Sequence, residues 1–172
     1  MQVQIKKQKK VATVRRKRPN LTMSQSIVYV PVDFNNNESL SAKLRAVPGF
    51  DTKAKTVVTL EGVSQYIPQA SVTKTISEIA SIIPAQSTFF VSFAPTPAQT
   101  DPTCKRLLNA VKRSGEPWVN FYDDGRKIFD GSDFRVTKEV GLEELEATVF
   151  APKGRMVQNV CKAERYCTAV KS

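Results

Sequence analysis

The apolar residues of this chain form short runs that alternate with stretches of helical spacing. Runs at 27–32, 56–60 and 88–93 are rich in β-branched and aromatic residues, which is typical of strands. Between the second and third runs, apolar residues recur every three or four positions from Pro68 to Pro84, which predicts a helix. The alternation of strands and helices predicts an α/β fold, with a doubly wound parallel sheet and crossover helices.

Further elements are expected around this central part. Ser39 has the side chain of an N-cap and precedes a short helix that is predicted to end at Pro48-Gly49. The last two strands are expected to pair antiparallel at an edge of the sheet, and residues 115–133 have no clear pattern. The remaining predicted elements are a helix at 104–114, a strand at 134–140, a helix at 142–149 and a strand at 165–170.

The positive charge of the chain is concentrated at its N-terminus. The formal net charge is +10, and residues 1–18 hold eight of the 26 Lys and Arg residues and no acid. Residues 19–172 carry 18 basic and 16 acidic residues, so the body of the protein is nearly neutral. We expect residues 1–18 to form a basic helix or arm.

The composition excludes several kinds of chemistry. The chain has no His, which excludes every mechanism that uses His as a base or as a metal ligand. The seven glycines form no phosphate-binding loop or nucleophile elbow. Cys104, Cys161 and Cys167 lack metal-ligand spacing, so no metal is expected, and they are interpreted as reduced thiols of a cytoplasmic protein. The apolar runs are too short to span a membrane, so no membrane partner is expected.

Two acids follow predicted strands directly, Asp33 after 27–32 and Glu61 after 56–60. In open α/β sheets, ligands bind at the carboxyl ends of the strands, so the two carboxylates are expected to share a rim. Such a pair would suit an adenosine-type ligand with an amino acid tail, and two unrelated loop acids remain the alternative interpretation. The adjacent acids Asp123-Asp124 and Glu143-Glu144 are expected to be solvated surface.

Several segments occur in an order that resembles the leucine carboxyl methyltransferase-like family of class I S-adenosylmethionine-dependent methyltransferases. They are residues 30–34, 44–51, 61–63, 66–68, 115–118 and 142–145, and the resemblance extends over about residues 3–170. It implies a Rossmann-like methyltransferase sheet and S-adenosyl-L-methionine as the cofactor. Asp33 and Phe34 match the positions that hold the adenine, and Glu61 matches the acid that receives the amino group of the cofactor. Tyr66 belongs to the same loop and is a candidate for the substrate side.

The chain also departs from the family pattern. In the family, a strand with a glycine-rich turn and a strand ending in a ribose-binding acid precede the basic helix that residues 2–17 resemble. Because this chain begins after those strands, we expect an N-terminally truncated member with an incomplete sheet. Residues 1–172 would then be the C-terminal portion of one methyltransferase domain, with weak or no activity of its own.

The sequence is therefore compatible with three functions. The first is methyl transfer to a carboxylate or hydroxyl oxygen of a small-molecule or protein acceptor; no catalytic residue is assigned, because the sulfonium is already activated. The second is nucleic-acid binding by the basic arm. Tyr29 is the only aromatic residue before Phe34, so the arm lacks a stacking platform and nucleic acid is the less favoured partner. The third is a non-catalytic interaction domain. The methyltransferase would become such a domain if the two N-terminal strands of the family are truly absent in the cell.

Overall fold

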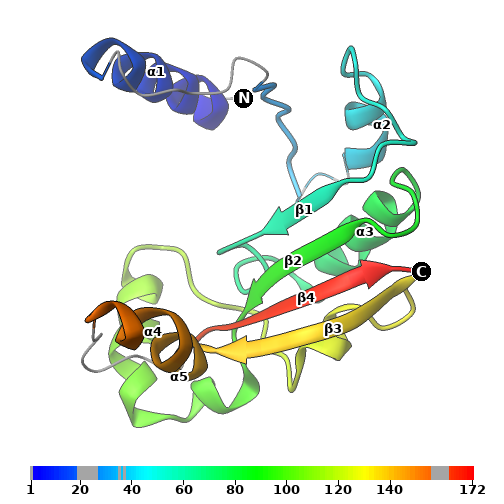
Figure 1. Ribbon diagram of the computed structural model, residues 1–172. Helices are drawn as coiled ribbons and strands as arrows, with labels where there is room; N and C mark the ends of the chain where they lie inside the picture. Colours follow the sequence, from blue (N-terminus) through cyan, green and yellow to red (C-terminus); the bar gives the residue numbers. More distant parts are fainter. Residues whose placement is uncertain (1, 19–26, 35, 37, 156–162) are drawn as a thin grey trace. The chain divides into compact units, whose positions relative to one another are not determined.

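The computed structural model describes residues 2–18, 27–34, 36, 38–155 and 163–172 (Figure 1). The chain divides into two compact units, Met1–Phe50 and Asp51–Ser172, and each is described by itself. In the described part, no helix combines the length and the apolar content that a membrane crossing requires.

The first unit contains two helices. The predicted basic helix is formed as α1 (Gln2–Lys17), and the predicted helix after Ser39 is formed as α2 (Leu40–Arg45). Ser39 is confirmed as the N-cap, because its Oγ accepts a hydrogen bond of 3.2 Å from the backbone N–H of Ala42.

The strand predicted at 27–32 is wrong, because these residues form no regular secondary structure. A strand exists only where its backbone N–H and C=O groups meet those of a neighbour. The described sheet consists of four strands that all belong to the second unit, and residues 27–32 are not among them. The β-branched residues of this run favour a strand conformation, but no strand of the described sheet pairs with it.

The second unit is built on a sheet with the order β1-β2-β4-β3. Its strands are β1 (Val57–Leu60), β2 (Thr88–Phe93), β3 (Phe134–Gly141) and β4 (Arg165–Lys171). β1 and β2 are parallel and are connected through α3 (Gln69–Ala80), which confirms the predicted crossover. The predicted antiparallel pairing of the last two strands is also confirmed. What the pattern did not predict is that β4 inserts between β2 and β3 and runs antiparallel to both (Figure 1).

The other helices of this unit are α4 (Pro102–Arg113) and α5 (Leu142–Leu145). The helix predicted at 142–149 changes its hydrogen-bonding pattern after α5, to a π turn at Glu146–Phe150 and a 3₁₀ turn at Ala151–Lys153. Two further 3₁₀ turns lie at Thr96–Gln99 and Gly125–Ile128, the second within the region that showed no clear pattern.

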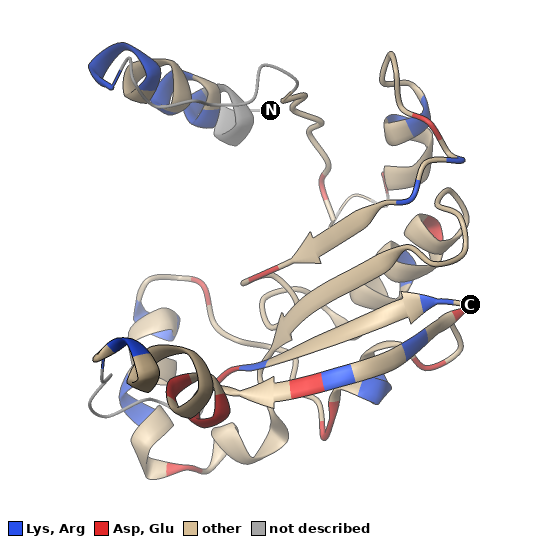
Figure 2. Cartoon of the chain, viewed as in Figure 1, with Lys and Arg blue, Asp and Glu red and all other residues tan. Residues whose placement is uncertain are grey.

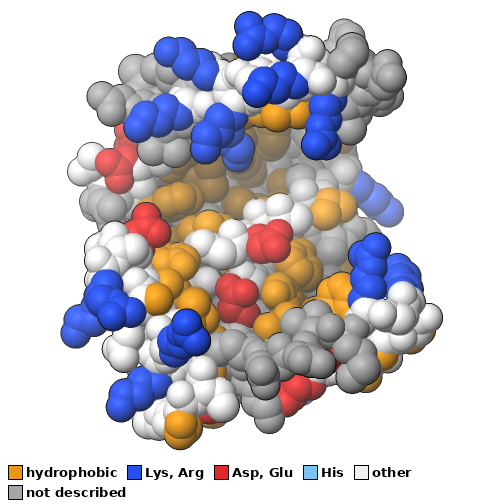
Figure 3. Space-filling model, turned by 90° about the vertical axis from the view of Figure 1, so that its left-hand side faces the viewer, with side chains coloured by type: hydrophobic (Ala, Val, Ile, Leu, Met, Phe, Trp, Pro, Cys, Tyr) orange, Lys and Arg blue, Asp and Glu red, His pale blue; other side chains and the backbone are white. Residues whose placement is uncertain are grey.

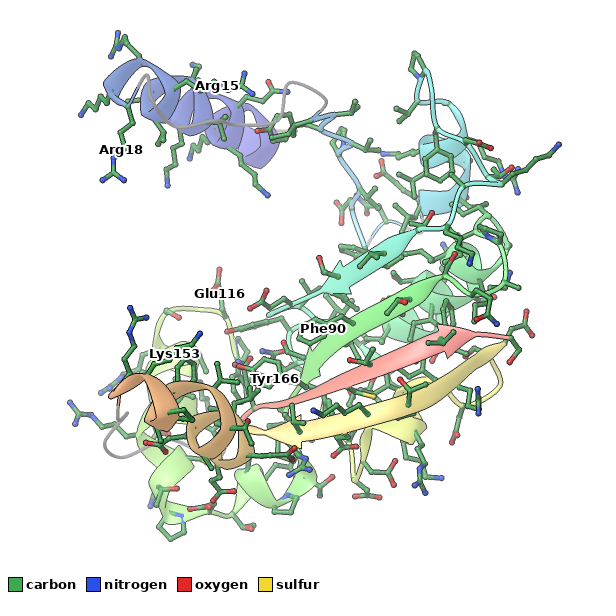
Figure 4. All side chains as sticks on the ribbon, in the orientation of Figure 1. Arg15, Arg18, Phe90, Glu116, Lys153 and Tyr166 are labelled. Carbon is green, nitrogen blue, oxygen red and sulfur yellow. The ribbon has the colours of Figure 1, made fainter. Side chains whose placement is uncertain are left out.

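The core lies on one face of the sheet. Phe89, Val91 and Phe93 of β2 are fully buried there, and α3 contributes Val72 and Ile76. Figure 1 shows α3 behind the sheet. On the opposite face, Phe90 of β2 and Tyr166 of β4 are half-buried, with stacked rings 5.9 Å apart (Figure 4). Val57 of β1 is 74% exposed on that face, so the two faces differ clearly in burial.

Candidate functional site

The candidate site begins at the carboxyl end of β1. Leu60, the last residue of the strand, is buried, and the next residue, Glu61, is exposed. Gly62 has a φ of +64°, in the left-handed region that favours glycine, and its backbone N–H donates a 2.9 Å hydrogen bond to Ser92 Oγ of β2. The chain therefore turns directly after Glu61, which leaves this carboxylate at the rim of the sheet.

Buried polar residues hold the loop that follows Glu61. Ser64 Oγ donates to the carbonyl of Ser92 at 2.7 Å, and the carbonyl of Gln65 accepts from Val119 N–H at 2.8 Å. Asn120 Nδ2 donates to the carbonyl of Ser64 at 3.2 Å. Because unpaired buried polar groups are costly, these bonds fix the loop to the end of β2 and to residues 119–120.

A second carboxylate, Glu164, lies at this end of the sheet, just before β4. The Gln65 amide Nε2 donates to Glu164 Oε1 at 2.8 Å. Burial raises the pKa of Glu164, the hydrogen bond from Gln65 lowers it, and the charge of Glu61 raises it further. The pKa of Tyr166 is raised by burial and by the charges of both acids, so Glu61, Glu164 and Tyr166 share one electrostatic environment.

Tyr66 lies beside the turn at Gly62. Both residues line an open pocket of about 520 Å³, together with residues 115–117 and Val119. Glu116 projects from the same loop (Figure 4). The Tyr66 ring packs edge-on against Trp118 with 6.2 Å between the ring centroids. The structure thus brings Tyr66 and the turn after Glu61 to one pocket.

A second cavity, of about 340 Å³, lies near the ends of β2 and β3 and has mainly acidic charged groups. Its charged lining residues are Asp101, Asp123, Glu139, Glu143, Glu164 and Arg165. Pro95, Pro97, Ala98 and Leu142 provide an apolar part. Arg165 Nε donates to Glu139 Oε1 at 2.6 Å, so the one cation is paired with one of the five acids. The formal charge that remains is negative.

Sequence reasoning missed this acidic cavity. Asp123 and Glu143 are exposed, as expected for solvated acids, but both line the cavity. Asp124 is half-buried, and its Oδ1 accepts from the backbone N–H of Arg126 at 2.7 Å. No spacing in the sequence signals the cavity, because its acids come from four separate segments, at 101, 123, 139–143 and 164.

Asp33 and Phe34 belong to the first unit. Asp33 is exposed: its N–H donates to Glu38 Oε2 at 2.7 Å, and its Oδ2 accepts from Asn36 Nδ2 at 2.8 Å. Phe34 is half-buried in a turn. The expectation that Asp33 ends a strand is wrong, because residues 27–32 form none. Since Asp33 and Glu61 lie in separate units, their common rim stays a prediction.

The remaining side chains with possible chemistry are the cysteines and the potential metal ligands. Cys104 and Cys167 are buried thiols, and Cys161 lies outside the described residues. Within the described ranges, Cys, Asp and Glu side chains form no group of three or more that could hold a metal ion.

Residues 1–80 match a family model described as leucine carboxyl methyltransferase. The resemblance to that family is confirmed over residues 1–80. This part contains Asp33, Phe34, Glu61 and Tyr66. No curated protein matches the chain.

Two solved structures share the fold of most of the chain. A DUF574 family protein from Streptomyces avermitilis is 13% identical with a TM-score of 0.64, over 94% of this chain and 62% of that one. A candidate methyltransferase from Thermobifida fusca is 13% identical with a TM-score of 0.61, over 92% of this chain and 59% of that one. The chain thus spans about three fifths of the length of these proteins. The α/β Rossmann-like fold class expected from the sequence is confirmed.

Proposed function

We propose that this chain belongs to an S-adenosylmethionine-dependent methyltransferase that transfers a methyl group to an oxygen of its acceptor. The family match over residues 1–80 and the fold support this class. The observation that carries the proposal is the exposed carboxylate of Glu61, at the carboxyl end of β1 and directly before the left-handed Gly62. This position is where open α/β sheets bind ligands.

The residues around Glu61 fit a positively charged ligand. Glu61 and Glu164 lie close enough for the charge of one to raise the pKa of the other, so a cation between them would relieve their repulsion. Gly62 has no atom within 4 Å of the place where a Cβ would stand, so a ligand can approach the backbone there. S-adenosylmethionine, when bound, supplies a methyl group already activated on a positively charged sulfur.

The protein's task in this reaction is to bind and align. Glu61 would accept hydrogen bonds from the amino group of the cofactor. Asp33 and Phe34 would hold the adenine, as their family positions imply, and Tyr66 would face the acceptor. Alignment of the nucleophile with the methyl–sulfur bond accounts for most of the catalysis, so the absence of His is compatible with it.

The acidic cavity is our candidate for the site of the acceptor's reacting group, and Tyr66, which lines the separate pocket of about 520 Å³, would contact another part of the acceptor. A carboxylate and a hydroxyl are both possible acceptors, but the negative lining would repel a carboxylate and accept hydrogen bonds from a hydroxyl. Glu164 is placed in the cavity lining, and its raised pKa makes it a better proton acceptor than an ordinary carboxylate. We therefore propose a hydroxyl-bearing acceptor, a small molecule or a protein, with Glu164 as the base.

We further propose that residues 1–172 act as one portion of a methyltransferase domain in the cytoplasm, where the cysteines would stay reduced. Cofactor binding by this chain alone would be weak. The physical reason is that residues 27–32 form no strand, so the backbone before Asp33 lacks the ladder hydrogen bonds that would hold it in place.

Isothermal titration calorimetry of the full chain with S-adenosylhomocysteine tests the cofactor site. We expect weak but measurable binding, which Glu61→Gln reduces at least tenfold through loss of a charge-assisted hydrogen bond. Glu144→Gln is the matched control, because Glu144 is an exposed acid on α5 outside both pockets. Equal affinities for the two variants, or no binding at millimolar ligand, would contradict the proposal.

A further inference from the structure

Helix α1 carries cations on all of its sides. The residues involved are Lys6, Lys7, Lys9, Lys10, Arg15, Arg16, Lys17 and Arg18, and all eight are exposed. At about 100° of rotation per residue, Lys9 and Arg16 share one side. Lys10 and Lys17 lie roughly a quarter turn away, and Lys7 and Arg18 lie opposite the first pair. Figure 2 shows no acidic segment on α1, and Figure 3 shows separate blue side chains spread over the visible face of the upper part of the molecule.

This arrangement is unfavourable for a helix in water without counter-charges. Lys6 and Lys10 are four positions apart, and Lys7 and Lys10 are three apart, so like charges face each other at helical spacing. Residues 1–18 contain no acid that could offset the repulsion within the helix. At 16 residues, α1 is only slightly longer than the isolated helices that are marginal in water even in favourable sequences. A bound polyanion would remove the repulsion and stabilise α1.

The distribution of side chains distinguishes between polyanions. A helix that lies on an anionic membrane needs an apolar stripe opposite its charges. The apolar residues of α1 are Val3, Ile5, Val11, Ala12 and Val14, and cations stand among them on every side of the helix. A single-stranded nucleic acid needs aromatic residues on which its bases stack, and residues 1–18 contain none.

A duplex places no such demands on the helix. The major groove of B-form DNA is about 12 Å wide, admits an α-helix, and presents phosphates on both of its sides. A helix with cations all round can meet both rows of phosphates at once. The major groove of an RNA duplex is too narrow for this. We propose that α1 is a sequence-independent binding element for double-stranded DNA, a function separate from methyl transfer.

The expected strength follows from counterion release. The 16 residues of α1 span about 24 Å, and over that length a duplex presents about 14 phosphate charges. Each phosphate contact contributes about 0.9 to the slope of log affinity against log salt. Six contacts would give a slope of about −5 and a loss of affinity of about a thousandfold between 50 and 200 mM salt.

Fluorescence anisotropy of the full chain with a labelled 24-base-pair duplex of arbitrary sequence tests the proposal. We expect binding at 50 mM salt with a slope of about −5. A variant with Lys6, Lys7, Lys9 and Lys10 all changed to Gln should make the slope shallower by 3 to 4 units, to about −1 to −2, and should weaken binding at least tenfold. The control changes Lys53, Lys55, Lys105 and Lys112 to Gln, since these exposed lysines of the second unit remove the same charge elsewhere.

Three further results would overturn the proposal. One is no binding at 50 mM salt, and another is an equal loss of affinity in the control variant. The third is tighter binding to a single strand, to an RNA duplex, or to vesicles of anionic phospholipid than to the DNA duplex. A thermal unfolding curve that is the same for both variants and the original chain excludes misfolding as the cause of a lost affinity.

Discussion

Gln65 and Glu164 are joined by a hydrogen bond of 2.8 Å between the amide Nε2 and the carboxylate Oε1, although 99 positions separate them in the chain. Gln65 is 1% exposed and lies in the loop after β1, whereas Glu164 precedes β4. This bond ties the turn that presents Glu61 to the lining of the acidic cavity.

The first prediction concerns the Gln65–Glu164 bond itself. Gln65→Met keeps the length of the side chain but removes the donor, which leaves Glu164 without this hydrogen bond. The free energy of unfolding should fall by about 1–2 kcal/mol, as measured by urea denaturation at pH 7. Gln69→Met, at an exposed position of α3, is the matched control and should change stability by less than about 0.5 kcal/mol. Equal effects of the two substitutions would show that the bond contributes nothing.

The second prediction concerns pH. Burial raises the pKa of Glu164 above its ordinary value of 4.5, so the folded protein holds this proton more tightly than the unfolded chain does. This contribution to stability is fully present below pH 4.5 and is lost as the pH rises through the folded pKa. Urea denaturation between pH 4.5 and 7 should therefore show a steeper decline for the original chain than for Glu164→Gln. The same slope in both proteins would contradict the assignment.

The third prediction concerns the close approach at Gly125. A Cβ on this residue would lie 2.6 Å from Cys167 Sγ and 2.9 Å from Glu139 Oε2, and the backbone N–H already donates to the same carboxylate oxygen. Gly125→Ala should cost about 1–3 kcal/mol of unfolding free energy by overpacking. Adding Cys167→Ala removes the sulfur and should recover part of the loss. If the effects of Gly125→Ala and Cys167→Ala on the unfolding free energy simply add, the contact between the new Cβ and the Cys167 sulfur is not the cause of the loss.

The fourth prediction concerns Cys167, whose pKa is raised to about 12, first by burial and then by the charges of Glu139 and Asp124. At pH 8 the thiol is neutral and buried, so it should not react with iodoacetamide in the folded protein. Mass spectrometry of a Cys161→Ser chain should show alkylation of Cys167 only after urea is added. Stability should also decline as the pH rises above 9, the ordinary value for this thiol. Fast alkylation of the native chain would refute the assignment.

The fifth prediction concerns Trp118, whose indole N–H is buried and has no hydrogen-bond partner within the described residues. Its ring lies 6.2 Å from that of Tyr66 and 6.3 Å from that of Phe121. Trp118→Phe keeps an aromatic ring and removes the unpaired donor, so it should change the unfolding free energy by less than about 1 kcal/mol. Trp118→Ala should cost about 2 kcal/mol or more, because the ring contacts are lost. Similar losses of unfolding free energy in Trp118→Phe and Trp118→Ala would show that the ring contacts are not the cause of the destabilisation.

The periodicity of apolar residues was sufficient to predict the helices and strands that bury one of their faces. β2 and α3 were predicted from the sequence because their apolar residues repeat with the geometry of a strand and of a helix, and both elements carry the core. The same reasoning failed at residues 27–32, since strand formation there requires a neighbour that the composition of the run cannot supply.

The α/β class, the acid at the end of β1 and the basic character of residues 1–18 could all be predicted from the sequence, because each depends on local order along the chain. The entry of β4 into the sheet between β2 and β3 could not, because it depends on contacts between strands far apart in the chain. That insertion brings Glu164 to Gln65 and places Arg165 beside Glu139, and so assembles a cavity from four separate segments. The physical reason is that strand order and burial arise from contacts between distant residues, which leave no periodic trace in the sequence.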